Sequence, residues 1–320
     1  MANIALTNRC NLSCEYCFAH EYTSSKKNDI SKESFMRALD FAKKDGEIGL
    51  IGGEPLLHKN INEFLSVLIS EGEIRRVTLF TNGIYLDKIK KENIHPKIIF
   101  LINVNEANDI GEKQFDKMRE NIRELLFYTD EERVTFGVNI YKENQNFSDI
   151  ISLLREFSLK KVRLSVVIPK DKGEGAFNYF NRMKKTLLTF CAELKDMGIS
   201  PCYDCNAIPE CVYTEDEKAF LSSLSYLNEH EKRVFTGKAS VCAPIVDIYP
   251  DLTASRCFGM SDYKVKIEDF ENISDLKNHF FYEIDTKLVH EPSKDECKGC
   301  YKQATFGCFG GCLCYKEVNI

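Results

Sequence analysis

Three cysteines near the start of the chain have the residue type and spacing of a metal site. Cys10, Cys14 and Cys17 lie within one short stretch, and the next cysteine in the chain is Cys191. Thiolates at this density favour soft metals, above all iron in a sulfide cluster. The irons of such a cluster normally take about four protein ligands. The stretch therefore predicts a cluster with one iron open to a ligand that is not protein.

Two simpler interpretations of these cysteines stay open at this point. A structural zinc ion would need a fourth ligand nearby, and His20 is the one candidate close in sequence. A disulfide would need an oxidising compartment. The sequence starts with no basic segment and no long apolar stretch, so we expect no signal peptide, a cytoplasmic location and reduced thiols. Nothing precedes the first predicted strand, so we also expect no N-terminal partner-binding domain.

The cysteine stretch resembles the CX3CXφC signature of radical S-adenosylmethionine (SAM) enzymes, with Tyr16 as the aromatic φ residue. A second segment, Gly52, Gly53, Glu54 and Pro55, resembles the GGEP motif of the same family. The resemblance implies that the open iron chelates the amino and carboxylate groups of SAM. It also implies that the glycine backbone and Glu54 approach the methionyl ammonium. Further contacts, to the ribose and adenine of SAM, are implied for Asn103, Asn139 and Val167.

The chemistry that this resemblance implies starts with a reduced 4Fe–4S cluster. The cluster passes one electron to the SAM sulfonium, and the C–S bond breaks to give methionine and a 5′-deoxyadenosyl radical. That radical then abstracts a hydrogen atom from the substrate. An electron donor such as flavodoxin or ferredoxin is implied as a partner. Cofactor and cluster supply the reactivity, while the protein positions the parts.

Short apolar runs alternate with segments of helical spacing, which predicts a parallel sheet built from strand–helix–strand units. The cysteine stretch, the Gly-Gly-Glu-Pro segment and Thr81-Asn82-Gly83 follow the first three runs. Chemistry in parallel barrels sits at these carboxyl ends of strands, so we expect one shared opening. Six such units match the partial (β/α)6 TIM-type barrel of radical SAM enzymes. The expected strands are Asn3–Leu6, Gly49–Ile51, Val77–Phe80, Ile98–Val104, Val134–Ile140 and Val162–Ile168.

The last third of the chain is rich in cysteine and resembles the SPASM extension of radical SAM maturases. We expect a barrel at residues 1–200 and a small auxiliary-cluster domain at residues 201–320. The resemblance implies two auxiliary 4Fe–4S clusters. The alternative is a twitch-like arrangement, with one cluster and the other cysteines on zinc or free. The implied ligands are Cys205, Cys211, Cys242, Cys257, Cys297, Cys300, Cys308 and Cys312, with Cys314 as a substitute.

Several features depart from the SPASM pattern. Leu252 stands where the pattern has glycine, and the gap between Cys300 and Cys308 is longer than usual. Cys314 follows Cys312 unusually closely, and Cys202 is additional. These departures leave the assignment of ligands open. Cys191 lies on an apolar helical stripe and is predicted to be a core residue.

Composition narrows the classes of partner. The chain has 320 residues, a formal net charge of −6 and 43% hydrophobic residues, which is typical of a globular protein. An acidic chain without a basic face argues against nucleic-acid binding. The longest apolar run, Ile98 to Val104, is too short to cross a membrane.

SPASM extensions are associated with peptide and protein substrates. The resemblance therefore implies a radical SAM enzyme that installs a thioether or carbon–carbon crosslink, or an epimerised residue, in a ribosomally synthesised peptide or a protein. A separate protein could hold the leader of such a peptide. One alternative is formylglycine formation of the anaerobic sulfatase-maturating type. Another, of a different class, is a non-enzymatic iron–sulfur electron carrier or zinc module.

Overall fold

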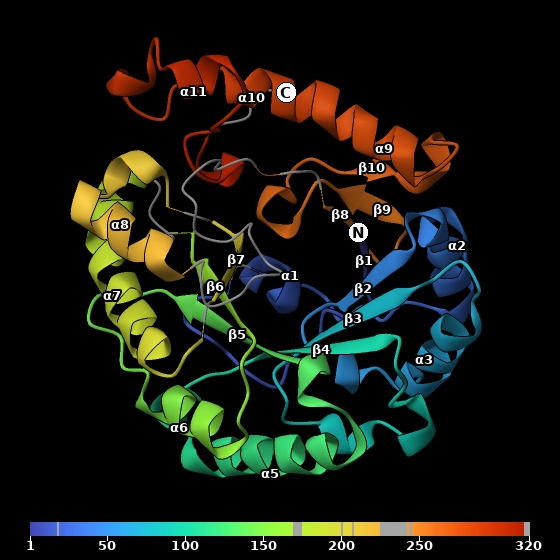
Figure 1. Ribbon diagram of the computed structural model, residues 1–320. Coiled ribbons are helices and arrows are strands. Elements are labelled where there is room, and N and C mark those ends of the chain that lie inside the picture. Colours follow the sequence, from blue (N-terminus) through green and yellow to red (C-terminus); the bar gives the residue numbers. More distant parts are fainter. Residues whose placement is uncertain are drawn as a thin grey trace. The chain divides into compact units, whose positions relative to one another are not determined.

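The computed structural model describes residues 1–17, 19–168, 175–199, 201–206, 208–224, 242 and 245–316, without the side chains of residues 203–205. The chain forms two compact units. The first comprises Met1–Thr135, Glu156–Leu159 and Pro244–Phe280. The second comprises Phe136–Arg155, Lys160–Ala243 and Phe281–Ile320. Figure 1 shows the elements of both units, coloured along the sequence.

The first unit holds a run of parallel strands that start near the N-terminus. β1 pairs with β2, β2 with β3 and β3 with β4, all in parallel. A late segment, β8, pairs in parallel with the other edge of β1 and continues as an antiparallel arrangement through β9 and β10. The strands are β1 (Ala2–Ala5), β2 (Glu47–Ile51), β3 (Arg76–Thr81), β4 (Ile98–Asn103), β8 (Val246–Ile248), β9 (Thr253–Ser255) and β10 (Val265–Lys266).

Helices connect these strands, and α2, α3, α5 and α9 each bury an apolar face. α2 begins after Ser31, whose hydroxyl oxygen accepts a 2.9 Å hydrogen bond from the Ser34 amide, and its buried face includes Phe35. Phe35 stacks on Phe64 of α3, with ring centroids 4.0 Å apart. The helices of this unit are α1 (His20–Ser24), α2 (Lys32–Ala42), α3 (Ile61–Ser70), α4 (Ala107–Ile110), α5 (Glu112–Tyr128) and α9 (Ile273–Phe280).

The second unit repeats the strand–helix alternation. β5 pairs in parallel with β6, and β6 with β7. Cys191 on α7 is fully buried, which confirms its prediction as a core residue. The strands are β5 (Val134–Ile140), β6 (Val162–Val166) and β7 (Cys202–Cys205). The helices are α6 (Ser148–Glu156), α7 (Ala176–Asp196), α8 (Glu215–Leu224), α10 (Thr286–Val289) and α11 (Tyr301–Ala304).

The mixed α/β class with parallel strands confirms the predicted fold class. All six expected strands are present, with ends shifted by a few residues. Within the described part of the chain, no helix has the length and apolar character needed to span a bilayer. The assignment of residues 1–200 and 201–320 to two domains stays a prediction. β8 pairs with β1, β9 pairs with β8, and β10 pairs with β9, so residues from beyond position 200 extend the sheet of the first unit.

Candidate iron–sulfur and SAM site

The Gly-Gly-Glu segment pairs with the chain that leads into the cysteines. β1 ends at Ala5, and the chain runs on through Thr7 and Arg9 beside the segment after β2. The Gly53 amide donates to the Thr7 carbonyl at 2.8 Å, and the Glu54 amide donates to the Arg9 carbonyl at 2.7 Å. These two hydrogen bonds fix the position from which the cysteine loop departs.

Both glycines are required by this backbone pairing. A Cβ atom on Gly52 would lie 2.3 Å from the Thr7 carbonyl oxygen, and Gly52 also has a φ of 152°. A Cβ atom on Gly53 would lie 2.3 Å from the Arg9 carbonyl oxygen. The sequence interpretation gave the glycines a close approach to SAM, which stays a prediction. The close approach that the structure describes is between two segments of the protein itself.

Glu54 is a buried organiser of neighbouring loops, with 1% of its surface exposed. Its carboxylate accepts hydrogen bonds from the Leu56 amide at 3.1 Å, the Thr81 hydroxyl at 2.8 Å and the Asn82 amide at 2.8 Å. Burial raises the pKa of Glu54 to about 7, while the three donors act to lower it. The carboxylate thus joins the ends of β2 and β3. Its predicted contact with the methionyl ammonium stays a prediction, and Pro55 begins the short helical turn that follows.

Two asparagines that are not among the predicted site residues contact the cysteine loop, although the segment of one of them, Asn82, was expected at the shared opening. The Asn82 side-chain amide donates to Asn11 Oδ1 at 2.9 Å, so the loop after β3 contacts the loop after β1. The Tyr16 hydroxyl donates to Asn105 Oδ1, which ties the predicted aromatic residue to the loop after β4. Asn105 is 4% exposed. The sequence signal that points to Asn82 and Asn105 is their position as polar residues just beyond a predicted strand.

The predicted nucleoside contacts lie at strand ends in both units. Asn103 is the half-buried last residue of β4, and Asn105 Nδ2 lies 3.4 Å from its carbonyl oxygen. Asn139 lies near the end of β5, and Val167 directly follows β6. The Val167 amide donates to the Ile140 carbonyl at 2.9 Å. Asn139 and Val167 belong to the second unit, and all three contacts with SAM stay predictions.

Asn8 anchors the second half of the cysteine loop. Its side chain is 2% exposed and donates to the Ser25 hydroxyl oxygen and the Lys26 carbonyl, both at 2.8 Å. Its Oδ1 accepts the Asn28 amide at 2.8 Å. A single side chain thus closes the stretch between the cysteines and α2.

Arg9 adds a second anchor at the entrance to the loop. Its guanidinium donates twice to the Asp29 carboxylate, at 3.0 and 2.7 Å, and once to the Leu57 carbonyl at 2.9 Å. Burial of Asp29 would raise its pKa, but hydrogen bonds from Thr7 and Arg9 leave that pKa below its ordinary value. This planar pairing is the bidentate geometry in which arginine differs from lysine.

The far side of the cysteine loop rests on an aromatic cluster. Cys17 and Tyr22 pack against Ala5, Ala19, Tyr249 and Phe258. The centroids of the Tyr22 and Phe258 rings lie 5.3 Å apart, and those of Tyr249 and Phe258 lie 5.4 Å apart. Tyr249 directly follows β8, so the late strand brings this aromatic support to the loop.

The three thiols interact with one another electrostatically. Burial, together with the neighbouring Cys10 and Cys17 groups, raises the pKa of Cys14 to about 11. The pKa of Cys10 is raised first by burial and also by Glu54 and Cys17. Mutual repulsion of thiolates is what bound iron would relieve, since a metal ion reverses the local electrostatics. This donor set therefore fits an iron–sulfur cluster held by Cys10, Cys14 and Cys17.

The described side chains around the three cysteines are not arranged to hold a single metal ion. Among the described residues, no group of three or more His, Cys, Asp or Glu side chains is placed to hold one metal ion. The cysteine side chains that the structure describes are free thiols. The described cysteines form no disulfide, and the assignment of Cys10, Cys14 and Cys17 to an iron–sulfur cluster stays a prediction.

A second group of cysteines forms within the second unit. Cys211, from the turn before α8, interacts electrostatically with Cys297 and Cys308 and with the Lys294 ammonium. Cys297 and Cys300 form one tight turn, since the Cys300 amide donates to the Cys297 carbonyl at 3.0 Å. These segments are far apart in sequence, and their thiols fit the predicted auxiliary cluster as a donor set.

The remaining predicted ligands are placed as follows. Cys312 and Cys314 are buried, at 7% and 5% exposure, in the second unit. Cys242 of the second unit and Cys257 of the first are half-buried. The side chain of Cys205 lies outside the described residues. The ligand roles of all these cysteines stay predictions.

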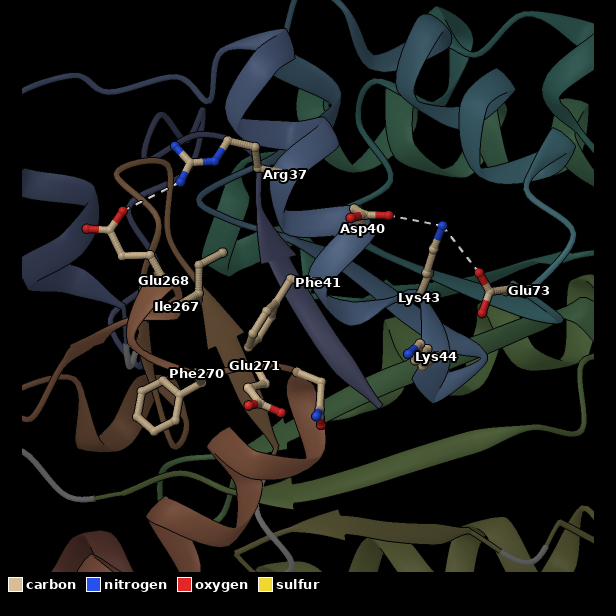
Figure 2. Close-up of a pocket in the computed structure, with 11 residues that line it drawn as sticks. Arg37, Asp40, Phe41, Lys43, Lys44, Glu73, Ile267, Glu268, Phe270 and Glu271 are labelled. Carbon is tan, nitrogen blue, oxygen red and sulfur yellow. Dashed lines mark ion pairs between the residues drawn. The ribbon is translucent and has the colours of Figure 1, made fainter.

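A separate cavity of about 530 Å³ lies at the end of α2, where the chain turns into the start of β2. Figure 2 shows its charged lining, in which Lys43 pairs with Asp40 at 3.0 Å and Glu73 at 3.2 Å. Arg37 pairs with Glu268 at 3.6 Å. The cavity contains no cysteine and lies by the amino end of β2, whereas the candidate site follows its carboxyl end.

The curated relatives that resemble this chain match only part of it. A GTP 3′,8-cyclase of Staphylococcus epidermidis is 27% identical over 197 residues, which are 56% of this chain and 57% of that protein. The chain thus spans little more than half the length of this curated relative.

Solved structures resemble the fold over 97% of this chain. SuiB of Streptococcus suis bound to S-adenosylmethionine has a TM-score of 0.62 at 15% identity, over 72% of its own chain. The structure described as native anSMEcpe with bound AdoMet and Kp18Cys peptide has a TM-score of 0.62 at 18% identity, over 88% of its chain. At these identities the likeness concerns the fold.

The family itself is shown by a direct match along the sequence. The model of the Radical SAM superfamily matches residues 4–163, half of the chain, and this range holds the cysteine loop and the Gly-Gly-Glu-Pro segment. These are the segments that the hydrogen bonds of Gly53 and Glu54 join. The chain belongs to the Radical SAM superfamily.

Proposed function

We propose that this protein is a radical SAM enzyme that modifies a residue of a ribosomally synthesised peptide or of a protein. The observation that carries the proposal is the fold likeness over 97% of the chain, including its cysteine-rich part, to SuiB and anSMEcpe. SuiB has also been solved with its precursor peptide SuiA, and anSMEcpe with a peptide. The second cysteine group, around Cys211, Cys297 and Cys308, supports the same proposal.

In this proposal Cys10, Cys14 and Cys17 hold a 4Fe–4S cluster. When bound, the cluster and SAM supply hydrogen-atom abstraction. The chain's own residues hold the loop in one conformation, through the Gly53 pairing on one side and Tyr16 on the other. A fixed, partly buried loop keeps water away from reactive species and positions the cofactor against the substrate.

The cysteines from Cys205 to Cys314 would hold one or two auxiliary clusters. A crosslinking or oxidising reaction must remove a second electron from the substrate, and an auxiliary cluster suits that role. An epimerising reaction must instead return a hydrogen atom, for which a thiol suits. The proposal covers both outcomes, with a reduced flavodoxin or ferredoxin as electron donor and a separate leader-binding protein as a further partner.

A second candidate is cyclisation of GTP, because a curated relative at 27% identity is a GTP 3′,8-cyclase. That similarity extends over 56% of the chain. Formylglycine formation is a variant of the leading proposal, because anSMEcpe shares the fold over the same range as SuiB.

The first test is anaerobic iron and acid-labile sulfide per chain, for the wild type and for the Cys10/Cys14/Cys17→Ala variant. Three 4Fe–4S clusters predict about 12 irons, falling to about 8 in the variant. A fall from about 8 to about 4 would indicate one auxiliary cluster. Equal iron in the two proteins would refute the assignment of these cysteines.

The second test distinguishes the substrate classes. Reduced, reconstituted enzyme is incubated with SAM alone, with SAM and GTP, and with SAM and a mixture of cytosolic peptides, and 5′-deoxyadenosine is quantified. The proposal predicts stimulation by peptides together with a mass change in one of them. Stimulation by GTP, with a cyclised nucleotide as product, would establish the second candidate instead. The triple cysteine variant is the matched control, because it should release no 5′-deoxyadenosine.

A further inference from the structure

A buried lysine lies beside the second cysteine group. Lys316 is 9% exposed, and its ammonium donates hydrogen bonds to the Leu288 carbonyl at 2.7 Å and the Glu291 carbonyl at 2.6 Å. A lysine is almost never buried to this degree unless its charge is held by polar partners. These two carbonyls lie at and just beyond the end of α10, and the Leu288 carbonyl also accepts the Glu291 amide at 3.1 Å.

A second side chain, that of Gln303, donates hydrogen bonds at the same end of α10. Gln303 lies between the predicted ligands Cys300 and Cys308 in sequence. The Gln303 amide group donates to the Val289 carbonyl at 2.9 Å and to the Glu291 carbonyl at 3.0 Å. Gln303 lies on α11, which begins directly after Cys300. Lys316 and Gln303 therefore bring two cysteine-bearing segments to one set of carbonyl groups.

The Lys316 ammonium also interacts electrostatically with the Cys297 and Cys308 thiols. Burial lowers the pKa of Lys316, whereas Glu291 and the two thiols act to raise it. Glu291 is exposed, so water screens its charge. The Lys316 ammonium is held by two neutral carbonyl groups, so its positive charge is only partly offset by its neighbours.

Other lysines in the same region are placed differently. Lys298 lies between Cys297 and Cys300 in sequence, but its side chain is 67% exposed and pairs with Asp295 at 2.8 Å. Lys302 is 48% exposed and pairs with Glu210. Lys294 lies over the Phe177 ring, 4.4 Å from its centroid. Burial, and not nearness in sequence, thus distinguishes Lys316 from Lys298 and Lys302.

We propose that Lys316 is a positioning residue that fixes a positive charge beside an auxiliary iron–sulfur cluster and raises the reduction potential of that cluster. When the cluster gains one electron its net charge becomes more negative, and a nearby cation in a poorly screened site stabilises that state. The inference rests on the auxiliary cluster of the proposed function. It adds the residue that tunes this cluster and the sign of the change in its reduction potential.

The test measures the potential of the auxiliary clusters alone. In the Cys10/Cys14/Cys17→Ala protein, which should keep only auxiliary clusters, redox titrations followed by electron paramagnetic resonance are compared with and without Lys316→Met. We expect one couple to fall at least tenfold in its equilibrium constant for reduction, about 59 mV for one electron. Lys316→Arg, which keeps the charge, should restore the potential, and Lys298→Met should leave it unchanged.

Each outcome decides a different question. If the background protein holds no iron, the auxiliary cluster of the proposed function is wrong, and the role of Lys316 is wrong with it. If it holds iron but Lys316→Met leaves every potential unchanged, the inference alone is overturned. If Lys316→Met loses iron, Lys316→Gln is titrated instead, because it is neutral but keeps hydrogen-bond donors. Loss of iron from both neutral variants would assign Lys316 a purely structural role and overturn the tuning role.

Discussion

Replacing Gly53 by alanine should loosen the cysteine loop by steric contact alone. Gly53 does not adopt a left-handed backbone conformation, so the added methyl group is not strained by φ. It would lie 2.3 Å from the Arg9 carbonyl oxygen and 2.6 Å from the Arg9 carbonyl carbon, both backbone atoms. One of the two segments must therefore move, and the hydrogen bonds of Gly53 and Glu54 to Thr7 and Arg9 are lost or lengthened.

The size of the expected destabilisation follows from the two hydrogen bonds that the Gly53 and Glu54 amides donate. Each backbone hydrogen bond is worth about 0.5–1.5 kcal/mol net, so the loop loses about 1–3 kcal/mol of local stability. The population of the open loop should then rise by roughly 5- to 150-fold, since about 1.4 kcal/mol is a factor of ten.

Two measurements check this prediction. Amide exchange of the Gly53 and Glu54 backbone should speed up by that factor in the apoprotein. Reconstituted G53A should hold about 4 fewer irons per chain than the wild type, if the cluster needs the closed loop. Gly72→Ala is the matched control, because a Cβ there has no neighbour within 4 Å. Wild-type exchange and wild-type iron in G53A would refute the steric reasoning.

Three other substitutions test buried polar groups of the first unit. Glu54→Gln should lower the melting temperature, because an amide group cannot accept from Leu56, Thr81 and Asn82 together, and one unpaired buried donor costs about 1–3 kcal/mol. Asn8→Ala should cost a similar amount and expose residues 20–29 to proteases; an unchanged cleavage pattern would contradict this. Burial raises the pKa of Asp247 to about 7. Asp247 therefore stabilises the fold below about pH 4, and this contribution is lost as the pH rises through about 7. Asp247→Asn should remove that trend. Since a rise of about three pKa units corresponds to about 4 kcal/mol, the free energy of unfolding of the variant in urea, relative to that of the wild type, should increase by about 4 kcal/mol between about pH 4 and 8.

Local sequence signals predict the parts of the structure that depend on residues close together in the chain. Ser31 is of a residue type that caps helices, and its hydroxyl oxygen accepts a hydrogen bond from the Ser34 amide. The strand expected at Val134–Ile140 has those bounds in the structure, since alternating apolar residues and helical neighbours define it without reference to distant parts. The order of the segments along the chain, with each loop after a strand, also placed the cysteine loop beside the Gly-Gly-Glu-Pro segment.

Long-range contacts explain what the sequence could not show. β8 has three residues, too few for a pattern to be recognised, and its partner β1 lies more than 240 positions earlier, as the Asn3 to Asp247 hydrogen bond records. The segment of β7 was singled out only for its cysteines, with Cys205 as a predicted ligand, and not as a strand. The SAM-binding role of Gly53 stays a prediction, while its packing role could not be predicted, because the Arg9 carbonyl that excludes a side chain there approaches only when the backbone is folded.

The parallel pairing of β8 with β1 has a consequence for the order in which this chain becomes native on the ribosome. β1 leaves the exit tunnel before β2 and β8, and it can pair with β2 on one edge early. Its other edge stays unpaired until Ile248 has been synthesised. At about 5–20 residues per second, that edge stays open for roughly ten seconds or more. An open strand edge invites pairing with another nascent chain. The late hairpin thus acts as the closing step of biosynthesis, and loss of it would be felt first as poor yield of native protein.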